Sequence, residues 1–252
     1  MIIKEIQDDV VVFTMQGEND LNLGVIGPEL YDHLAEYQAD NDLRCAVIRG
    51  AGRKAFSAGG DIKQVAAGGF NFSFWSPPPR SPLSGEQFWK PLIAAVNGHA
   101  LGIGMMLALV CDIRIATKTA SFGLPEVKYG FPPILGATQR LPRTIAMGPA
   151  LEMLLTGDAI SAEQAERWGF VNRVVEYDEL LPAALALAKR IAANPPLGVQ
   201  TSKELALRAQ DMTIEQGLRM ESMLSHIARQ TEDAQEGPRA YAAKRKPVFK
   251  GR

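Results

Sequence analysis

Short apolar runs of strand length alternate with helical periods through the first half of the chain, and this alternation restricts the fold more than any other feature. The pattern predicts strands at residues 10–14, 43–49, 92–96 and 112–116, with a helix near residues 25–38. Strands that alternate with helices favour a layered α/β fold with parallel strands. We therefore expect a βα core in the first half.

The second half has a different pattern, which predicts helices throughout from residue 138 onward. Ser161 followed by Gln164 forms a capping box that opens a helix, and Gly169 closes it. Further helices are expected at residues 180–191, 196–209 and 213–229. We therefore divide the chain into a core over residues 1–195 and a C-terminal helical region over residues 196–252.

Charge and hydropathy limit the functions that the chain can have. Its 27 Lys and Arg and 28 Asp and Glu give a net charge of −1, and no basic tract exceeds Lys244 to Lys246, which argues against a nucleic-acid partner.

The longest apolar stretch, residues 100–111, is short of the ~20 residues of a membrane span. No secretory leader is found at Met1, so we expect a cytoplasmic protein. Cys45 and Cys111 are expected to be small buried side chains.

Residues 65–90 change in composition and predict a loop. Pro77, Pro78 and Pro79 remove ladder donors and fix φ, which excludes a central strand. Four aromatic side chains stand in the six residues 70–75, namely Phe70, Phe72, Phe74 and Trp75. A surface excursion is one interpretation, but so many aromatic side chains favour a lid or pocket wall.

Two glycine-rich turns each follow an expected strand and lead into an expected helix. They are FSAGGDI at residues 56–62 and NGHALGIG at residues 97–104. Glycine lets the backbone approach a ligand closely, and a helix N-terminus leaves N–H groups unpaired. Two such turns can direct two donors at one oxygen, although either turn alone is as easily a tight connection.

Six motifs in order give the chain a resemblance to a known family. They are FSAGGDIK at 56–63, VNGHALG at 96–102, CDIRIA at 111–116, FGLPE at 122–126, TQRL at 138–141 and KRKPVF at 244–249. In order and spacing they resemble the enoyl-CoA hydratase/isomerase (crotonase) family over essentially the whole chain. The resemblance implies an α/β fold, with a ββα spiral core and an α-helical C-terminal trimerisation region that assembles trimers or hexamers.

The resemblance also implies an acyl-CoA thioester substrate, no separate cofactor and no metal. By position in the motifs, the backbone N–H groups of Gly60 and Ile103 would hold the thioester carbonyl oxygen. Ile103 replaces a glycine that is common in the family, but the donor is a backbone group. Further substrate contacts are implied at Ala58, Asp61, Ile62, Lys63, Met106, Ile134 and Phe249. Among these, Lys63 and the tail around Lys246 and Phe249 would contact the phosphates and adenine of coenzyme A, and Asp61 is also expected to cap a helix.

Proton removal beside a thioester places negative charge on the carbonyl oxygen, which two N–H donors can stabilise. A base must also lie within reach. Of the two acid positions of the family, one is Met106 here, which cannot transfer a proton, and the other is Glu126. No Asp or Glu occurs from residue 127 to residue 151. Glu126 is therefore the single candidate acid/base, and burial beside methionines would raise its pKa.

A single acid/base favours one reaction of the family over the other. Moving a double bond needs one base that removes a proton and returns it elsewhere, so isomerisation of the Δ3-Δ2 enoyl-CoA type is the preferred hypothesis. Hydration or dehydration would need a second acid from elsewhere, for which Asp20, Glu86 and Tyr129 are candidates. A non-catalytic acyl-CoA binder is the third alternative.

Overall fold

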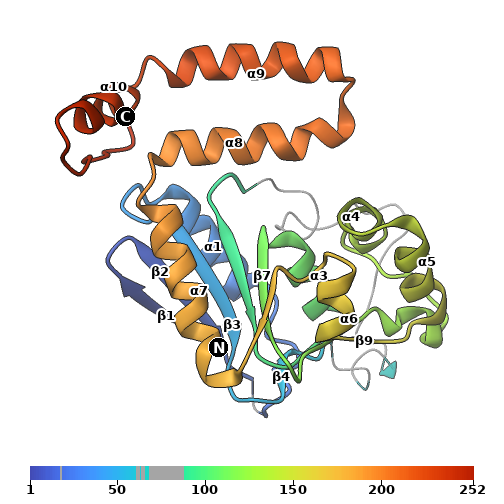
Figure 1. The fold of residues 1–252 in the computed structure, drawn as a ribbon. Helices are drawn as coiled ribbons and strands as arrows, with labels where there is room; N and C mark the ends of the chain where they lie inside the picture. The colour runs from blue at the N-terminus through green and yellow to red at the C-terminus, as the bar shows by residue number, and fades with distance from the viewer. Residues whose placement is uncertain (18, 61–62, 64–65, 68–87) are drawn as a thin grey trace.

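The computed structural model of the 252-residue chain describes every residue except residue 18, residues 61–62, residues 64–65 and residues 68–87 (Figure 1). The expected lid at residues 70–75 therefore lies outside the described residues. The same holds for Asp61, Ile62 and Glu86.

Six strands form the main sheet, in the order β1-β2-β3-β5-β7-β10 (Figure 1). Their bounds are β1 (Ile2–Gln7), β2 (Val10–Met15), β3 (Cys45–Gly50), β5 (Leu92–Val96), β7 (Ile113–Thr117) and β10 (Arg173–Val175). β1 and β2 form an antiparallel hairpin, while all other neighbours pair in parallel. The four predicted strands are present as β2, β3, β5 and β7, which confirms the α/β expectation.

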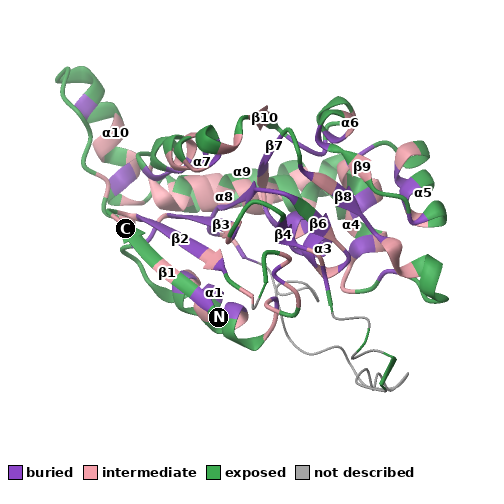
Figure 2. Cartoon of the chain, turned by 90° about the horizontal axis from the view of Figure 1, so that it is seen from below, coloured by how far each residue is buried: buried purple, intermediate pink, exposed green. Residues whose placement is uncertain are grey.

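Alternate residues of these strands enter two separate cores. Val11 and Phe13 face the side covered by α1 (Pro28–Ala39) and α3 (Ile103–Val110), whereas Val10 and Val12 face α7 (Tyr177–Ala192). Both faces of the sheet are thus covered by helices, as expected for parallel strands whose sequences are continuously apolar. Buried residues concentrate in β2, β3, β5 and β7, whereas β1 at the edge of the sheet is mostly exposed or half-buried (Figure 2).

A second sheet of four short strands lies beside the first and carries the glycine-rich turns. Its order is β4 (Ala55–Ser57), β6 (His99–Leu101), β8 (Ser121–Gly123) and β9 (Ile160–Ser161). The chain passes from β5 to β6 and then into α3, and from β7 to β8 and then into the 3-10 helix η2 (Pro125–Tyr129). Each unit is a strand of the main sheet, a strand of the small sheet and a helix, which is the ββα arrangement that the family resemblance implies.

The second half is mostly helical, but the prediction of helices throughout is wrong. The helices are α4 (Ala137–Thr144), α5 (Met147–Thr156), α6 (Ala162–Arg167), α7, α8 (Pro196–Arg208), η3 (Ala209–Asp211), α9 (Ile214–Ala228) and α10 (Glu232–Ala242). The strands β9 and β10 interrupt them, because they pair with β8 and β7 respectively. Two or three residues carry too little pattern to reveal such pairing. Ser161 caps α6, since its Oγ accepts from the Gln164 N–H at 3.1 Å, which confirms the N-cap half of the predicted capping box.

Helices α8 and α9 extend across the top of the core as an antiparallel pair (Figure 1), and neither has a fully buried residue. None of the described helices combines the length and the apolar character that crossing a bilayer requires. Cys45 and Cys111 are buried free thiols, as predicted, and burial raises the pKa of each to about 12.

Candidate active site

The first glycine turn begins where β4 ends, and the segment before α1 is hydrogen-bonded to it. The Ala58 N–H donates to the Leu21 carbonyl at 2.9 Å, and the Gly59 carbonyl accepts from the Gly24 N–H at 3.1 Å. Gly59 has φ +102°, a conformation that favours glycine. The Ser57 hydroxyl group also accepts from the Gly59 N–H at 3.3 Å and donates to the Asn22 carbonyl at 2.9 Å. Main-chain hydrogen bonds and this hydroxyl group together therefore fix the backbone that leads to Gly60.

The second turn joins β6 to α3 through Gly102, whose φ is +53°. Its N–H donates to the Gly123 carbonyl at 3.0 Å, which ties the turn to β8. Ile103 is the first residue of α3, and the N–H of a first helical residue has no acceptor inside its own helix. A Cβ on Gly104 would stand 2.1 Å from the Ser57 carbonyl oxygen, so glycine is required for α3 to approach β4.

The two turns, 43 residues apart at Gly59 and Gly102, touch each other. A Cβ on Gly59 would lie 3.0 Å from the Leu101 carbonyl oxygen and 3.9 Å from the Gly102 Cα. The pairing of β4 with β6 causes this contact, because the parallel strands end at the same edge of the small sheet. Gly60 and Ile103 each directly follow one of the two contacting glycines.

The Glu126 carboxyl group lies at the same place. Glu126 is on η2, and a Cβ on Gly102 would stand 3.0 Å from its Oε1 and 4.0 Å from its Cδ. Its Oε2 is buried and has no hydrogen-bond partner among the described residues. Burial raises the pKa of Glu126, as expected from the sequence, and a hydrogen bond to its own backbone opposes the increase. A carboxyl group in this state can accept a proton and return it.

The opposite face of η2 is anchored to the end of α5. Lys128 Nζ lies 2.6 Å from Asp158 Oδ1, and a Cβ on Gly157 would stand 3.0 Å from Val127 Cγ1. After η2 the chain turns at Gly130, which has φ +88°, and the Phe131 N–H donates to the Glu126 carbonyl at 3.4 Å. These contacts fix the short helix that carries the carboxyl group.

The other predicted contacts are dispersed. Ala58 lies in the first turn, and Lys63 lies exposed a few residues after it. Met106 is 2% exposed and part of the core, whereas Ile134 is 38% exposed. Phe249 packs beside α10, where a Cβ on Gly237 would stand 3.8 Å from its ring, and Figure 1 shows α10 at the opposite end of the molecule from α5. Within one chain, Phe249 is thus not brought to Glu126.

The two candidate second acids that are described lie in different surroundings. Asp20 lies between β2 and α1 and contacts the turn before β4, with Oδ2 3.8 Å from Lys54 Nζ and Oδ1 3.1 Å from a Cβ on Gly52. Tyr129 is on η2 with Glu126 and is 57% exposed. Of these two, only Tyr129 belongs to the element that carries the carboxyl group.

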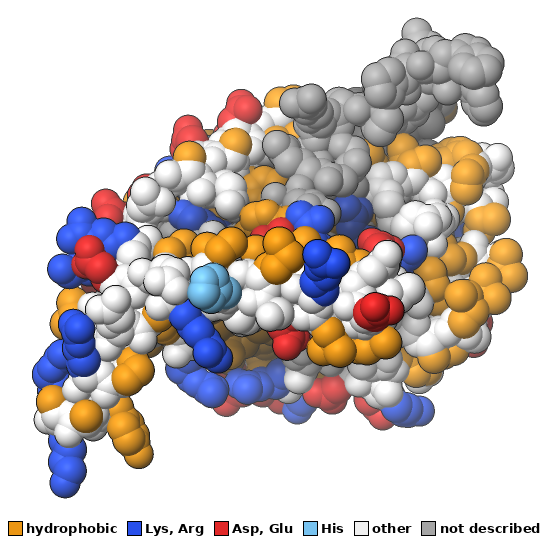
Figure 3. Space-filling view, turned by 90° about the horizontal axis from the view of Figure 1, so that it is seen from above, with side chains coloured by type: hydrophobic (Ala, Val, Ile, Leu, Met, Phe, Trp, Pro, Cys, Tyr) orange, Lys and Arg blue, Asp and Glu red, His pale blue; other side chains and the backbone are white. Residues whose placement is uncertain are grey.

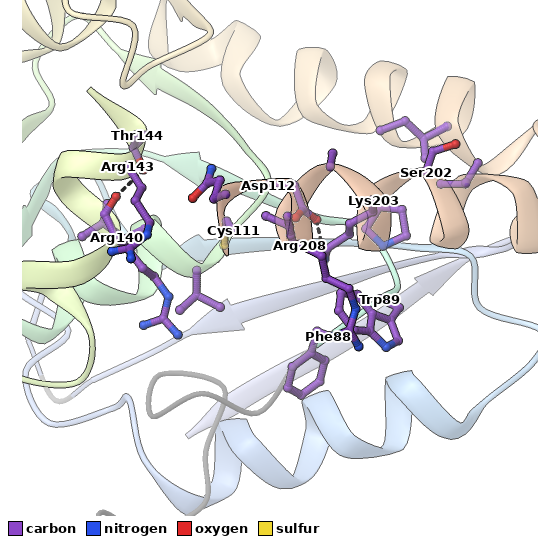
Figure 4. Close-up of a pocket in the computed structure, with 18 of the residues that line it drawn as sticks. Phe88, Trp89, Cys111, Asp112, Arg140, Arg143, Thr144, Ser202, Lys203 and Arg208 are labelled. Carbon is purple, nitrogen blue, oxygen red and sulfur yellow. Dashed lines mark hydrogen bonds and ion pairs between the residues drawn. The ribbon is translucent and has the colours of Figure 1, made fainter. Parts of the chain in front are cut away.

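A cavity of about 1090 Å³ lies elsewhere, between the end of α3, α4 and α8 (Figure 4). Lys203 crosses it from α8 and donates to Asp112 Oδ2 at 2.8 Å and to the Lys90 carbonyl at 2.9 Å. Burial raises the pKa of Asp112, and Lys203 opposes that change. Neither Glu126 nor the glycine turns line this cavity. Its ion pair connects α8 to the core, a connection that the sequence analysis missed because the partners are 91 residues apart.

Comparison with known proteins gives a consistent result. A family model described as enoyl-CoA hydratase/isomerase matches residues 5–252. The chain is 39% identical over 263 aligned positions to an (E)-benzylidenesuccinyl-CoA hydratase from Thauera aromatica, with 98% of each chain covered. It is 42% identical over 222 positions to a carnitinyl-CoA dehydratase from Salmonella typhi, with 86% of this chain and 85% of the relative covered.

Solved structures show the same similarity in three dimensions. An enoyl-CoA hydratase from Bacillus anthracis superimposes with a TM-score of 0.91 at 36% identity, covering 100% of this chain and 99% of its own. An enoyl-CoA hydratase from Mycobacterium marinum gives a TM-score of 0.90 at 34% identity, with the same coverage.

Proposed function

Since the chain belongs to the enoyl-CoA hydratase/isomerase family, we propose that its Glu126 carboxyl group transfers a proton at a carbon of an acyl-CoA thioester. The thioester carbonyl oxygen is held by the backbone N–H groups of Gly60 and Ile103. The observation that carries this proposal is the contact of Gly102 with both Gly59 and the Glu126 carboxyl group. It brings both turns and the carboxyl group to one point.

The two N–H groups supply the electrostatic part of the reaction. Removal of the α-proton turns the thioester into an enolate, and the negative charge that develops on its oxygen is stabilised by fixed donors that need no reorganisation. Loss of one such donor typically costs about 3–4 kcal/mol of barrier. Lys63 is exposed and close in sequence to the first turn, which suits a contact with a coenzyme A phosphate.

Glu126 supplies the proton transfer. Its pKa is raised by burial, and no charged side chain of the described residues contributes to that shift. Since Met106 is buried and cannot exchange a proton, Glu126 both takes and returns the proton in the reaction that we favour. We favour double-bond isomerisation, in which the proton leaves one carbon and returns to another.

Hydration or dehydration is the second candidate, and the names of the relatives favour it. The two curated relatives compared above are a hydratase and a dehydratase of acyl-CoA substrates. In that reaction Glu126 would deliver or remove the proton while a water or hydroxyl group is held beside it. Tyr129 is the described candidate that lies on the same short helix.

Proton exchange tests the shared step without assuming the product. Butanoyl-CoA incubated with the protein in D₂O is expected to gain deuterium at the α-carbon, measured by mass spectrometry. Glu126→Gln should reduce the exchange rate by about 100-fold or more, as expected for loss of a general base. Glu152→Gln, at an exposed position on α5, is the matched control and should retain the wild-type rate. Binding of butanoyl-CoA without any exchange would identify a non-catalytic binder and contradict the proposal.

Product analysis then separates the two reactions. But-3-enoyl-CoA should yield crotonyl-CoA if the protein is an isomerase, and crotonyl-CoA should yield 3-hydroxybutanoyl-CoA if it is a hydratase. Conversion of crotonyl-CoA alone would reject isomerisation and favour the second candidate.

The C-terminal helices support a homo-oligomer, trimeric or hexameric. Four large apolar side chains of α9 are at least 56% exposed, namely Ile214, Leu218, Met223 and Ile227. Figure 3 looks down on α9 and shows hydrophobic side chains along this face. Light scattering should report three or six chains. Leu218→Lys is expected to reduce the measured mass. A wild-type mass that corresponds to a single chain would contradict the assembly.

A further inference from the structure

The 3-10 helix that carries Glu126 has two distinct faces. Val127 and Lys128 are directed toward α5, where they contact Gly157 and Asp158. Side chains three residues apart eclipse each other in a 3-10 helix. Tyr129 therefore shares the face of Glu126, whose carboxyl group contacts Gly102. This shared face is the one that an acyl group held against the Glu126 carboxyl group would meet if the proposed function holds.

The ring of Tyr129 is supported by a second aromatic side chain. Its centroid lies 6.5 Å from that of Phe131, with an angle of 27° between the ring planes. Phe131 is held next to Glu126, because its N–H donates to the Glu126 carbonyl. Both side chains are exposed, Tyr129 to 57% and Phe131 to 40%. Two stacked rings with open surface, one on the helix that carries Glu126 and one directly after it, present an exposed aromatic area.

We propose that Tyr129 and Phe131 form a binding subsite for an aromatic ring in the acyl group, so that the preferred substrates are aryl-substituted acyl-CoA thioesters. This inference rests on the proposed function, since it assumes that Glu126 faces the acyl chain. Aromatic rings prefer offset or edge-to-face contact with other rings, at centroid distances of about 4.5–7 Å. A saturated ring of similar size buries comparable area but lacks the quadrupole that makes this geometry favourable.

Coverage of the same rings by a second copy of the chain is the competing explanation for their exposure. The eclipsed position of Tyr129 and Glu126 favours the substrate, because a subunit contact needs no alignment with the carboxyl group. The oligomer mass of the variants, measured by light scattering, distinguishes a substrate contact from a subunit contact.

Two saturated acyl-CoA probes test the subsite without assuming isomerisation or hydration. 3-Phenylpropanoyl-CoA and 3-cyclohexylpropanoyl-CoA have the same number of carbon atoms and the same α-protons. We expect the wild type to exchange the α-protons of the phenyl compound with the higher kcat/KM. Tyr129→Leu, which removes the ring, should reduce the phenyl-to-cyclohexyl ratio by about fivefold to tenfold, as expected for one aromatic contact. Phe131→Leu should reduce it in the same direction.

Tyr129→Phe is the matched control, because it keeps the ring and removes only the hydroxyl group. It should leave the phenyl-to-cyclohexyl ratio within about twofold of the wild-type value. A large decrease in this variant would show that the hydroxyl group, not the ring, contacts the substrate, and would overturn the subsite. An unchanged phenyl-to-cyclohexyl ratio in Tyr129→Leu would also overturn the subsite. A lower oligomer mass of that variant would then identify the two rings as a subunit contact. Exchange of butanoyl-CoA by the wild type, measured in parallel, keeps these outcomes separate from a failure of the proposed function, in which the wild type would exchange none of the three thioesters.

Discussion

The carboxyl group of Glu126 lies against the backbone of Gly102, so closely that a Cβ at residue 102 would stand 3.0 Å from Oε1. The contact joins η2 to the turn that begins α3. It has two consequences for the carboxyl group. Its position is set by main-chain atoms, and the absence of a side chain at residue 102 leaves space beside it.

Gly102→Ala should disturb this contact directly. The added methyl group forces the carboxyl group to move, and alanine is strained at φ +53°. We expect α-proton exchange to fall by about 10- to 100-fold, since small displacements of a catalytic group have effects of this size. Gly169→Ala is the control, because Gly169 has φ +79° but nothing lies within 4 Å of its Cβ. Equal losses of activity in both variants would show that backbone strain, not the contact, is responsible.

Gly104→Ala should affect folding rather than chemistry alone. Its Cβ would lie 2.1 Å from the Ser57 carbonyl oxygen, so α3 must move away from β4. We expect a loss of about 3 kcal/mol or more in the free energy of unfolding, measured by urea denaturation. Gly148→Ala, in α5 with open space around its Cβ, should instead be neutral or stabilising by up to about 1 kcal/mol. A Gly104 variant as stable as wild type would contradict the packing of α3 on β4.

The pH dependence of exchange follows from the raised pKa of Glu126. The reactive base is the carboxylate, so the exchange rate should rise with pH and reach a plateau above the pKa, which lies higher than the usual 4.5. Rates measured from pH 4 to pH 9 test this expectation. An acid limb with its midpoint below pH 4.5 would show that the carboxyl group is solvated in the working enzyme.

The same shift has an effect on stability. Because the folded protein binds the Glu126 proton more tightly than the unfolded chain does, the stabilising contribution is present below the unfolded pKa and is lost as pH rises through the folded pKa. Glu126→Gln, which stays neutral, should therefore unfold at a higher temperature than wild type at pH 8. The difference should disappear near pH 4. A difference that is independent of pH would contradict burial as its cause.

Lys203 and Asp112 should make a larger contribution than the exposed ion pairs. Lys203→Met leaves the Asp112 carboxylate buried without its charged partner, and we expect a loss of about 2–3 kcal/mol in stability. Lys118→Met removes an ion pair to Glu176 in which both side chains are more than 60% exposed, and should cost less than about 0.5 kcal/mol. Similar losses in the two variants by chemical denaturation would show that Asp112 is better solvated than its position indicates.

Local pattern in the sequence was enough to predict the larger elements. The strand at residues 92–96 has its predicted bounds, and α8 and α9 each end within one residue of prediction, because their periodicity and caps extend over many residues. Ser161 and Thr213 cap their helices as expected of their types. The four-strand sheet was not predicted. Its strands have two or three residues each and exist only through pairing with partners distant in the chain.

Residue type and local spacing by themselves determined the alternation of strands and helices in the core, the helices of the C-terminal region and the two glycine turns. The ββα arrangement and the choice of Glu126 rested on the resemblance of the motifs to the family. Only the tertiary structure decided that Gly59, Gly102 and Glu126 meet, that Met106 is buried, and that Phe249 packs beside α10, at the opposite end of the molecule from α5. Contacts between residues so far apart in the chain, 24 for Gly102 and Glu126 and 43 for Gly59 and Gly102, depend on strand pairing and helix packing. No local pattern specifies those contacts, because their energy comes from the surface that the whole fold buries.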